Sequence, residues 1–182
     1  MRVITGTARG RVLKTLPGDA TRPTTDKVKE AVFSAIQFDV EGRRVLDLFA
    51  GSGQMGIEAL SRGAAHAVFV DASREAASVV KENLQKTDLF ANATVICRKA
   101  EDFLNTAERF DLVFVDPPYA SDLLLQVLQR LPRCLSDYAT VICEHPTSVT
   151  LPQTVGTLVA GKPKQYGKIG VTIYRNQVAS NG

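Results

Sequence analysis

The sequence predicts a single α/β domain, in which helices cover both faces of a mostly parallel sheet. Short apolar runs alternate with helical patterns from residue 43 onward, and parallel strands need long, usually helical, connections. The length of 182 residues, 45% of them apolar, suits one such domain and leaves little room for a second. We therefore expect one domain over residues 1–182, with an extension at 1–40 and a core at 41–178.

The N-terminal extension predicts a small β-hairpin followed by a helix. Two short strands, VIT and VLK, are expected within residues 2–16, and the arginines around their turn suit phosphate contact better than core packing. Pro23 fixes the chain before a helix that should begin near Thr25 or Asp26 and run through KVKEAVFSAIQ. One face of this helix is apolar and is expected in the core: Val28, Val32, Phe33 and Ile36.

The sequence of residues 41–178 predicts alternating strands and helices, and therefore a parallel sheet. Ligands of such sheets bind beyond the carboxyl ends of the strands. Two closing strands are expected on either side of the sequence KPKQYGK. The expected strands are 44–48, 67–70, 94–97, 112–115, 140–143, 155–160 and 169–174, and the expected helices are 53–62, 74–84, 101–105 and 123–131.

The sequence VLDLFAGSGQMGIEAL, residues 45–60, predicts a strand that passes through a glycine turn into a helix. Gly51, Gly53 and Gly56 allow a sharp turn and a close approach to a ligand, which the free N–H groups of the helix start would face. The spacing is G-x-G-x-x-G, and Asp71 follows Gly51 by 20 residues. A nicotinamide-dependent oxidoreductase is therefore one interpretation of this stretch.

Asp47 favours a different cofactor, because dinucleotide sites usually have an apolar residue near the end of this strand. A buried carboxylate is costly unless it meets a donor or ligand, and the cationic methionine end of S-adenosylmethionine would be one. The stretch resembles motif I of the class I S-adenosylmethionine-dependent methyltransferases. The cofactor-binding candidates are Asp47, Phe49, Ala50, Gly51, Gly53, Asp71, Ala72 and Ala100.

Asp71 and Ala100 are the candidates for binding the nucleoside. One carboxylate can accept two hydrogen bonds, so Asp71 suits the two ribose hydroxyls, with a helix-start acid beside Ser73 as the structural alternative. Ala100 falls where many class I enzymes hold the adenine ring with a backbone N–H. Those enzymes commonly have Asp or Asn one residue earlier, where this chain has Lys99, so the mode of adenine recognition stays open.

The sequence Asp116-Pro117-Pro118-Tyr119 ends the fourth expected strand and resembles motif IV of the amino-methyltransferases. A base amine is a poor nucleophile because its lone pair is delocalised into the ring. If the Asp116 carboxylate and the Pro117 carbonyl each accept one amine hydrogen, the lone pair can face a methyl donor, and the prolines preorganise both acceptors. Tyr119 can stack on a base swung out of its helix. The catalytic candidates are Asp116, Pro117, Pro118 and Tyr119, with a plain strand-ending turn as the alternative.

Positive charge gathers at both ends of the chain, although the net charge is only +3. Residues 1–30 contain seven cations and three acids, and residues 145–182 contain four cations and no acid. Basic flanks fit polyanion binding, with a solvated basic surface as the alternative. The RNA-binding candidates are Arg2, Arg9, Arg11, Lys14, Arg22, Lys162, Lys164 and Lys168.

For the cysteines and for Glu144 and His145 we expect mainly structural roles. Cys97, Cys134 and Cys143 form no C-x-x-C pair, so we expect reduced thiols and no metal site. Glu144 and His145 could touch a base pocket, but a core or surface role is favoured for both. The chain shows neither a long apolar run nor the apolar core of a signal peptide, which predicts a soluble, cytoplasmic protein.

Four blocks, RVITGTARGRVLKT, TRPTTDKVKEAVFSAI, VLDLFAGSGQMGIEALSRGA and DLVFVDPPY, resemble in that order the bacterial small-subunit (16S) rRNA guanine-N2 methyltransferase family (RsmD-like). The resemblance implies a seven-stranded, Rossmann-like class I sheet ending in an antiparallel hairpin. It implies methyl transfer from S-adenosylmethionine to the N2 amine of one guanine in small-subunit ribosomal RNA, free or within an assembling 30S particle, by a monomer. It also implies that the basic hairpin and the segment Arg22-Pro23-Thr24 border the active site and the RNA.

Two further alternatives to this reading stay open. The glycine motif and D-P-P-Y also occur together in adenine-N6 methyltransferases of DNA or RNA, which act on a different base amine. A catalytically silent RNA-binding assembly factor could keep the cofactor fold without the reaction.

Overall fold

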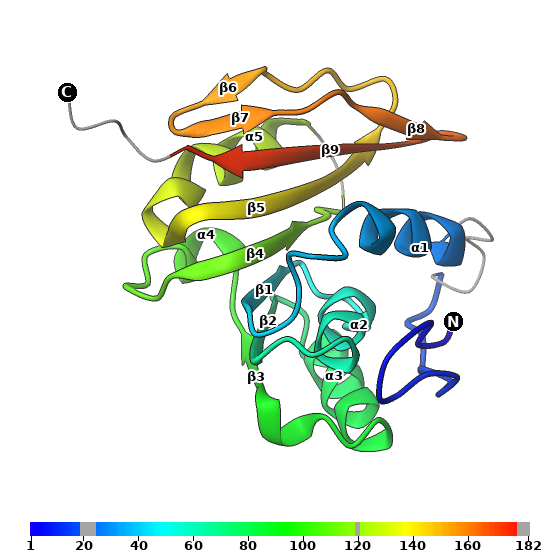
Figure 1. Ribbon diagram of the computed structural model, residues 1–182. Coiled ribbons are helices and arrows are strands. Elements are labelled where there is room, and N and C mark those ends of the chain that lie inside the picture. Colours follow the sequence, from blue (N-terminus) through cyan, green and yellow to red (C-terminus); the bar gives the residue numbers. More distant parts are fainter. Residues whose placement is uncertain (19–24, 119–120, 178–182) are drawn as a thin grey trace.

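The computed structural model describes residues 1–18, 25–118 and 121–177, which form one mixed sheet flanked by helices (Figure 1). The strands are β1 Arg44–Leu48, β2 His66–Asp71, β3 Ala93–Cys97, β4 Phe110–Val115, β5 Leu135–Pro146, β6 Thr154–Val155, β7 Leu158–Ala160, β8 Lys164–Tyr166 and β9 Ile169–Asn176. The helices are α1 Thr25–Ala35, α2 Gln54–Ser61, α3 Arg74–Lys86, α4 Ala100–Phe103 and α5 Ser121–Arg130, with short 3₁₀ turns at Phe90–Asn92 and Leu131–Cys134.

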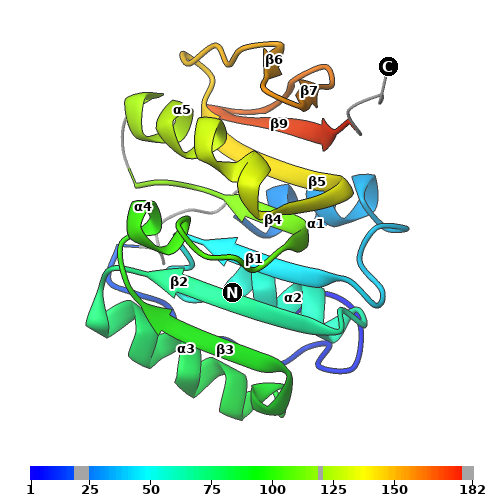
Figure 2. The ribbon, with the colours of Figure 1, turned by 90° about the vertical axis from the view of Figure 1, so that its left-hand side faces the viewer.

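The strand order is β3-β2-β1-β4-β5-β9-β7-β6, and β8 also pairs with β9. Strands β1 to β5 are parallel, and Figure 2 shows β1, β2 and β3 side by side with their arrows pointing the same way. Strand β9 runs antiparallel to β5 and starts beside the end of β5. The predicted sheet, mostly parallel with an antiparallel end, is therefore confirmed. We call the edge where β1 to β5 end the carboxyl edge, and the opposite edge the amino edge.

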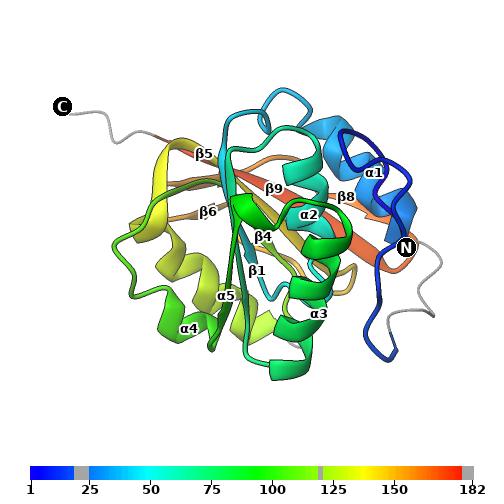
Figure 3. The same cartoon turned by 90° about the horizontal axis from the view of Figure 1, so that it is seen from below.

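Helices cover both faces of the sheet (Figure 3). Helices α1, α2 and α3 pack on one face, while α4 and α5 pack on the other. Strand residues alternate between the two layers, so that Val45 faces the first layer and Leu46 the second. The predicted apolar face of α1 is buried, and the Phe33 ring lies 5.5 Å from the Phe114 ring between their centroids.

The N-terminal segment differs from the predicted hairpin. Within residues 1–18, one antiparallel bridge between Arg2 and Val12 and a few backbone hydrogen bonds join the two arms, but VIT and VLK do not form regular strands. The segment also packs on the core, because Val3, Ala8 and Leu13 are buried in the first layer. Arg2, Arg9 and Arg11 are exposed, and their contact with phosphate stays a prediction. Beside the backbone bonds between its two arms, the segment hydrogen-bonds to side chains of α2 and α3. We call residues 1–18 the N-terminal strap.

The C-terminal part has more strands than predicted. The single strand expected at 155–160 is interrupted by a turn at Gly156, whose φ of 58° breaks the extended backbone and separates β6 from β7. The sequence KPKQYGK, expected as a connection, contains β8, which turns at Gly167 and pairs with β9. The sheet therefore has nine strands where the resemblance implied seven.

Candidate active site

The glycine turn joins β1 to α2 at the carboxyl edge. Phe49, Gly51 and Gly53 all have positive φ angles, of 64°, 57° and 82°, and the Ala50 N–H bonds to the Val70 carbonyl of β2. A Cβ built on Gly51 would meet no atom within 4 Å, so the turn borders open space there. A Cβ at Gly56 would lie 2.3 Å from a Phe69 ring carbon, which is why α2 can pack so closely on β2. The turn, the close packing and the open side agree with the predicted ligand turn.

Asp47 lies one residue before the end of β1 and is 4% exposed. Its Oδ2 accepts a hydrogen bond of 2.9 Å from the Gly56 N–H, in the first half of α2. Burial raises the pKa of Asp47 to about 7, the Gly56 N–H opposes that rise, and the negative charge of Asp71 adds to it. Such a carboxyl group favours a cationic partner, as the sequence predicted.

Asp71 ends β2 and joins the two helix starts. Its Oδ2 accepts from the Gly51 N–H at 2.9 Å, and its Oδ1 accepts from the Ser73 N–H at the same distance. Ser73 in turn caps α3 by accepting a hydrogen bond from the Ala76 N–H. A carboxylate has about four acceptor positions, so Asp71 can hold the turn and still accept from two ligand hydroxyls. The structural and the ligand-binding interpretations of Asp71 are therefore compatible.

The D-P-P turn follows β4 at the same edge. Strand β4 is the neighbour of β1, with Val115 beside Leu48, so Asp116 starts its turn next to the start of the glycine turn. Asp116 and Pro118 are exposed, and Pro117 is half-buried. Tyr119, the fourth catalytic candidate, lies outside the described residues. The structure thus brings together the two predicted motifs at one place on the sheet.

The predicted adenine side of the site lies at the ends of β2 and β3. Ala72 is exposed, and its carbonyl lies 3.6 Å from the Cys97 Sγ. Ala100 is buried at the start of α4, with the exposed Lys99 as the residue that precedes the helix. The predicted adenine contact, Ala100, and the further cofactor candidate, Ala72, therefore lie at the carboxyl edge near Asp71.

The predicted RNA-binding residues separate into two groups. Lys162, Lys164 and Lys168 are exposed, and the backbone of Lys168 bonds to Thr147 just past the end of β5, at the carboxyl edge. Arg11 instead contacts the Lys86 carbonyl and Asp88 at the end of α3, which is the amino edge. The implication that the whole basic hairpin borders the active site is therefore wrong for its tip.

Other members of the basic set have contacts within the chain. Arg9 is exposed, and its backbone N–H donates to the Gly6 carbonyl within a turn. The Thr7 N–H of this turn donates to the carbonyl of Ser61, the last residue of α2. The Lys14 ammonium donates to Glu82 of α3 at 3.0 Å. Arg2 is exposed, and its carbonyl accepts from Lys29. Arg22 lies outside the described residues.

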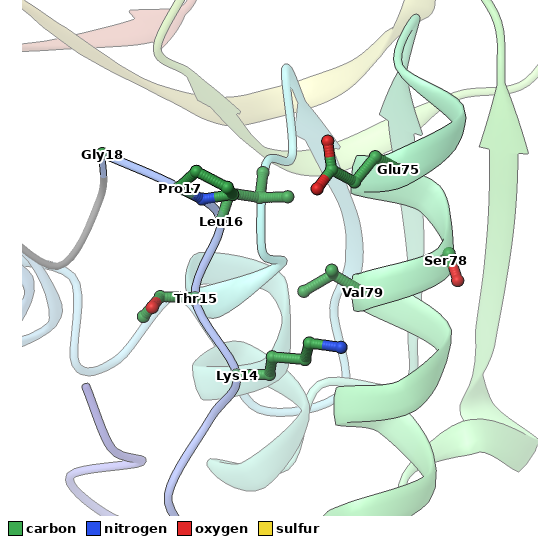
Figure 4. A pocket seen from close by; sticks show the side chains of 8 residues that line it. All are labelled: Lys14, Thr15, Leu16, Pro17, Gly18, Glu75, Ser78 and Val79. Carbon is green, nitrogen blue, oxygen red and sulfur yellow. The ribbon is translucent and has the colours of Figure 1, made fainter.

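A pocket of about 490 Å³ lies between the strap and α3 (Figure 4). The strap residues from Lys14 to Gly18 line one side of it, and Glu75, Ser78 and Val79 line the other. It contains none of the predicted catalytic or cofactor residues. The pocket does reach the first turn of α3, where Glu75 follows Asp71 by four residues.

Sequence reasoning missed two residues that shape the site. Asn83, fully buried in α3, donates to the Ser52 carbonyl in the glycine turn and also exchanges hydrogen bonds with the Lys14 backbone. Gln54, the first residue of α2, has a buried side-chain oxygen with no hydrogen-bond partner among the residues that the structure describes. A polar residue inside an otherwise apolar helix face, and another inside a glycine motif, were the signals that could have indicated them.

His145 has the core role that was favoured for it, and His66 contacts the neighbouring strand. His145 is buried, and its two ring nitrogens lie within hydrogen-bond distance of the Pro146 carbonyl and the Thr172 hydroxyl. His66 lies 2.9 Å from the Thr94 hydroxyl at the far end of the sheet. His66 therefore lies at the amino edge, and His145 lies near the carboxyl end of β5 with its ring held by these two contacts.

A Rossmann-like sheet with a glycine turn after its first strand and a D-P-P turn after its fourth defines a class I methyltransferase. The comparisons with known proteins agree. The chain belongs to the family described as conserved hypothetical protein 95, whose model matches residues 1–175. This is the RsmD-like family of the resemblance, and its members act on ribosomal RNA as methyltransferases.

Two relatives and two solved structures illustrate the match. "Putative rRNA methyltransferase YlbH" of Bacillus subtilis is 44% identical over 97% of this chain and 100% of its own length. "Ribosomal RNA small subunit methyltransferase D" of Escherichia coli K12 is 33% identical over 97% of this chain and 90% of its own. The solved structure of "Putative methyltransferase yhhF from Escherichia coli" is 30% identical in sequence and superposes with a TM-score of 0.89. The match covers 98% of this chain and 99% of that one.

A more distant structure shares the fold. It is a Thermus thermophilus 16S rRNA N2 G1207 methyltransferase, described as a complex with AdoMet and guanosine, with a TM-score of 0.74 and 18% identity over 89% of this chain and 45% of its own. Membership of a methyltransferase family removes the nicotinamide-dependent interpretation of the glycine turn. Within the described residues, no helix is long and apolar enough to cross a bilayer.

Proposed function

We propose that the protein transfers a methyl group from S-adenosylmethionine to the N2 amine of a guanine in small-subunit ribosomal RNA. The observation that supports this most directly is the position of the D-P-P turn, which starts on the strand beside the glycine turn. Family membership supports ribosomal RNA as the substrate. The four sequence blocks support guanine over adenine, because the first two are the ones that separate this family from adenine-N6 enzymes.

The described residues fit the proposed cofactor. Asp71 can accept from the ribose hydroxyls while it holds Gly51, and the turn at Gly51 borders open space. The buried Asp47 favours a positive charge, which the methionine part supplies. Phe49, Ala50 and Gly53 would line the methionine side, and Ala72 and Ala100 would contact the adenine. These assignments extend the geometry to a ligand and are part of the proposal.

S-adenosylmethionine, when bound, supplies an electrophilic methyl group on a positively charged sulfur. The Asp116 carboxylate and the Pro117 carbonyl would accept the two hydrogens of the guanine amine and turn its lone pair toward the cofactor side. The negative charge of Asp116 also favours the cationic nitrogen that exists before a proton leaves. Because Pro117 and Pro118 stiffen the turn, little reorganisation is needed at the moment of reaction. Transfer is then direct, with no covalent enzyme intermediate.

We further propose that the RNA approaches across the carboxyl edge. Lys162, Lys164 and Lys168 project from the chain around β8, whose partner strand starts beside the end of β5. Phosphate contacts there would place a flipped-out base at Asp116, where Tyr119 would stack on it. The protein would act as a monomer on free RNA or on an assembling 30S particle.

The proposal is tested by incubating the protein with radiolabelled S-adenosylmethionine and small-subunit RNA or particles from cells lacking the enzyme, followed by digestion to nucleosides. Label in N2-methylguanosine is expected. Label in N6-methyladenosine would instead show that the protein is an adenine-N6 methyltransferase. Binding of cofactor and RNA without any transfer would establish a silent assembly factor.

The role of Asp116 is tested by Asp116→Ala. Loss of one preorganised acceptor should lower the rate of transfer by about 100-fold or more, while cofactor and RNA binding change by only a few-fold. Asp137→Ala, which removes an exposed carboxylate at the start of β5 and far from the turn, is the matched control and should keep the parent rate. An unchanged rate in the Asp116 variant would rule out this role.

A further inference from the structure

Gln54 has a buried acceptor that no described residue satisfies. It is the first residue of α2, directly after Gly53, and its side chain is partly buried. Its Oε1 is buried and has no hydrogen-bond partner, the one such side-chain atom across residues 1–18, 25–118 and 121–177. Buried polar atoms without partners are rare in native proteins, because each one costs stability. A ligand that brings a donor would remove that cost.

The surroundings of Gln54 indicate the charge of the missing donor. Gln54 shares the first helical turn with Gly56, whose N–H is held by Asp47, and it follows the turn whose Gly51 N–H is held by Asp71. Two carboxylates therefore flank the loop, close enough for the charge of Asp71 to act on Asp47. Such an acceptor-rich place favours a positively charged N–H donor over a neutral one.

We propose that Gln54 is a cofactor-binding residue whose Oε1 accepts a hydrogen bond from the α-ammonium group of the methionine part of S-adenosylmethionine. An ammonium group has three N–H donors and no acceptor, so it can serve an amide oxygen and a carboxylate together. This inference rests on the proposed function, because it assumes that cofactor. Under this inference two side chains, Asp47 and Gln54, contact the ammonium group of the cofactor, whereas the sequence indicated only Asp47.

Calorimetric binding of S-adenosylhomocysteine, which keeps the α-amino group, tests the inference without any turnover. Gln54→Met has a similar length and a good helix propensity but no acceptor, so it should bind S-adenosylhomocysteine about tenfold more weakly than the parent. Gln54→Leu serves as the second variant if the first does not fold. Gln85→Met changes an exposed glutamine near the end of α3 and should bind like the parent.

The analogue of S-adenosylhomocysteine that lacks the α-amino group separates a direct contact from a change in the loop. Parent and Gln54→Met should bind this analogue equally. A variant that loses the same factor for both ligands, or for neither, would overturn the inference. Normal binding of S-adenosylhomocysteine with loss of transfer to RNA would also overturn it, since the donor would then belong to the base. If the parent itself binds no S-adenosylhomocysteine, the proposed function fails instead.

Discussion

Asp47 shows how one buried side chain can make cofactor binding depend on pH. Its pKa is raised to about 7, mainly by burial, so the carboxyl group is neutral in acid and charged in base. The unfolded value is near 3.8, so the free protein loses stability as pH rises between these two values. A cationic ligand needs the charged form, and its binding should therefore strengthen as pH rises through 7.

We expect S-adenosylhomocysteine to bind about tenfold more tightly at pH 8 than at pH 6, because one proton must leave Asp47 on binding. Calorimetry in buffers of different ionisation enthalpy would measure that proton directly. Asp47→Asn cannot release it and should show a flat profile. A parent profile as flat as that of the variant would show that Asp47 is already charged in the free protein.

Gly56 shows a packing constraint at the same scale. A methyl group there would lie 2.3 Å from a Phe69 ring carbon, inside the contact distance of two carbons. Gly56→Ala should therefore lower the free energy of unfolding by about 1 kcal/mol or more, even though alanine favours a helix. Gly161→Ala, whose methyl would meet its nearest atom at 3.6 Å, should stay within about 0.5 kcal/mol. Urea unfolding of both variants measures this difference.

At the scale of elements, a buried carboxylate joins the strap and α1 to α2. Glu58 is fully buried and accepts from the Ile4 and Thr5 N–H groups, while the Lys29 ammonium of α1 lies 3.8 Å from its Oε1. Lys29 is itself 1% exposed and donates to the Arg2 carbonyl. Burial lowers the pKa of Lys29, and the charge of Glu58 works against that lowering. One side chain thus connects three segments that are distant in sequence.

Glu58→Gln should cost about 3 kcal/mol of stability, because it removes the buried partner of the Lys29 charge and leaves only the half-exposed Asp26 carboxylate, at 4.0 Å. Glu82→Gln removes a carboxylate from an exposed pair with Lys14 and should cost less than about 1 kcal/mol. Denaturant unfolding of the two variants compares the same chemical change in two environments. Equal losses would mean that solvent reaches the Glu58 pair in solution.

The N-terminal strap also marks a limit of prediction from sequence. The short apolar runs VIT and VLK on either side of a glycine-containing turn are typical of strands, so the pattern predicted a hairpin. Val3 and Leu13 do bond across the strap, to the Arg11 and Met1 carbonyls. The N–H groups of Ile4, Ala8 and Lys14 instead donate to the Glu58, Ser61 and Asn83 side chains, and nothing local indicates hydrogen bonds to residues more than 50 positions away. The apolar face of α1 was predictable because helical spacing is a local property.

At the scale of the molecule, the candidate site was predictable because parallel strands all end at one edge. Once Asp47, Asp71 and Asp116 were each placed at the end of a strand, topology alone brought them together. The charged residues were less informative about the RNA-binding surface. The sequence gives the sign of each charge, but the fold decides at which edge of the sheet the charge lies. The basic N-terminus and the basic C-terminus look equivalent in sequence, yet Arg11 lies at the amino edge and Lys168 at the carboxyl edge.

That difference predicts which end binds RNA near the reacting base. Lys164→Ala with Lys168→Ala removes two cations at the carboxyl edge, and Arg9→Ala with Arg11→Ala removes two at the amino edge. If both lysines contact phosphates, the first double variant should lower the slope of log affinity against log salt by about 1.5, since fewer counterions are released. The second should keep the parent slope. The two proteins have the same net charge, so a titration over several salt concentrations isolates position from charge. Equal slopes for both variants would mean that the RNA covers both edges, and a loss confined to the arginine variant would place it at the amino edge, away from Asp116.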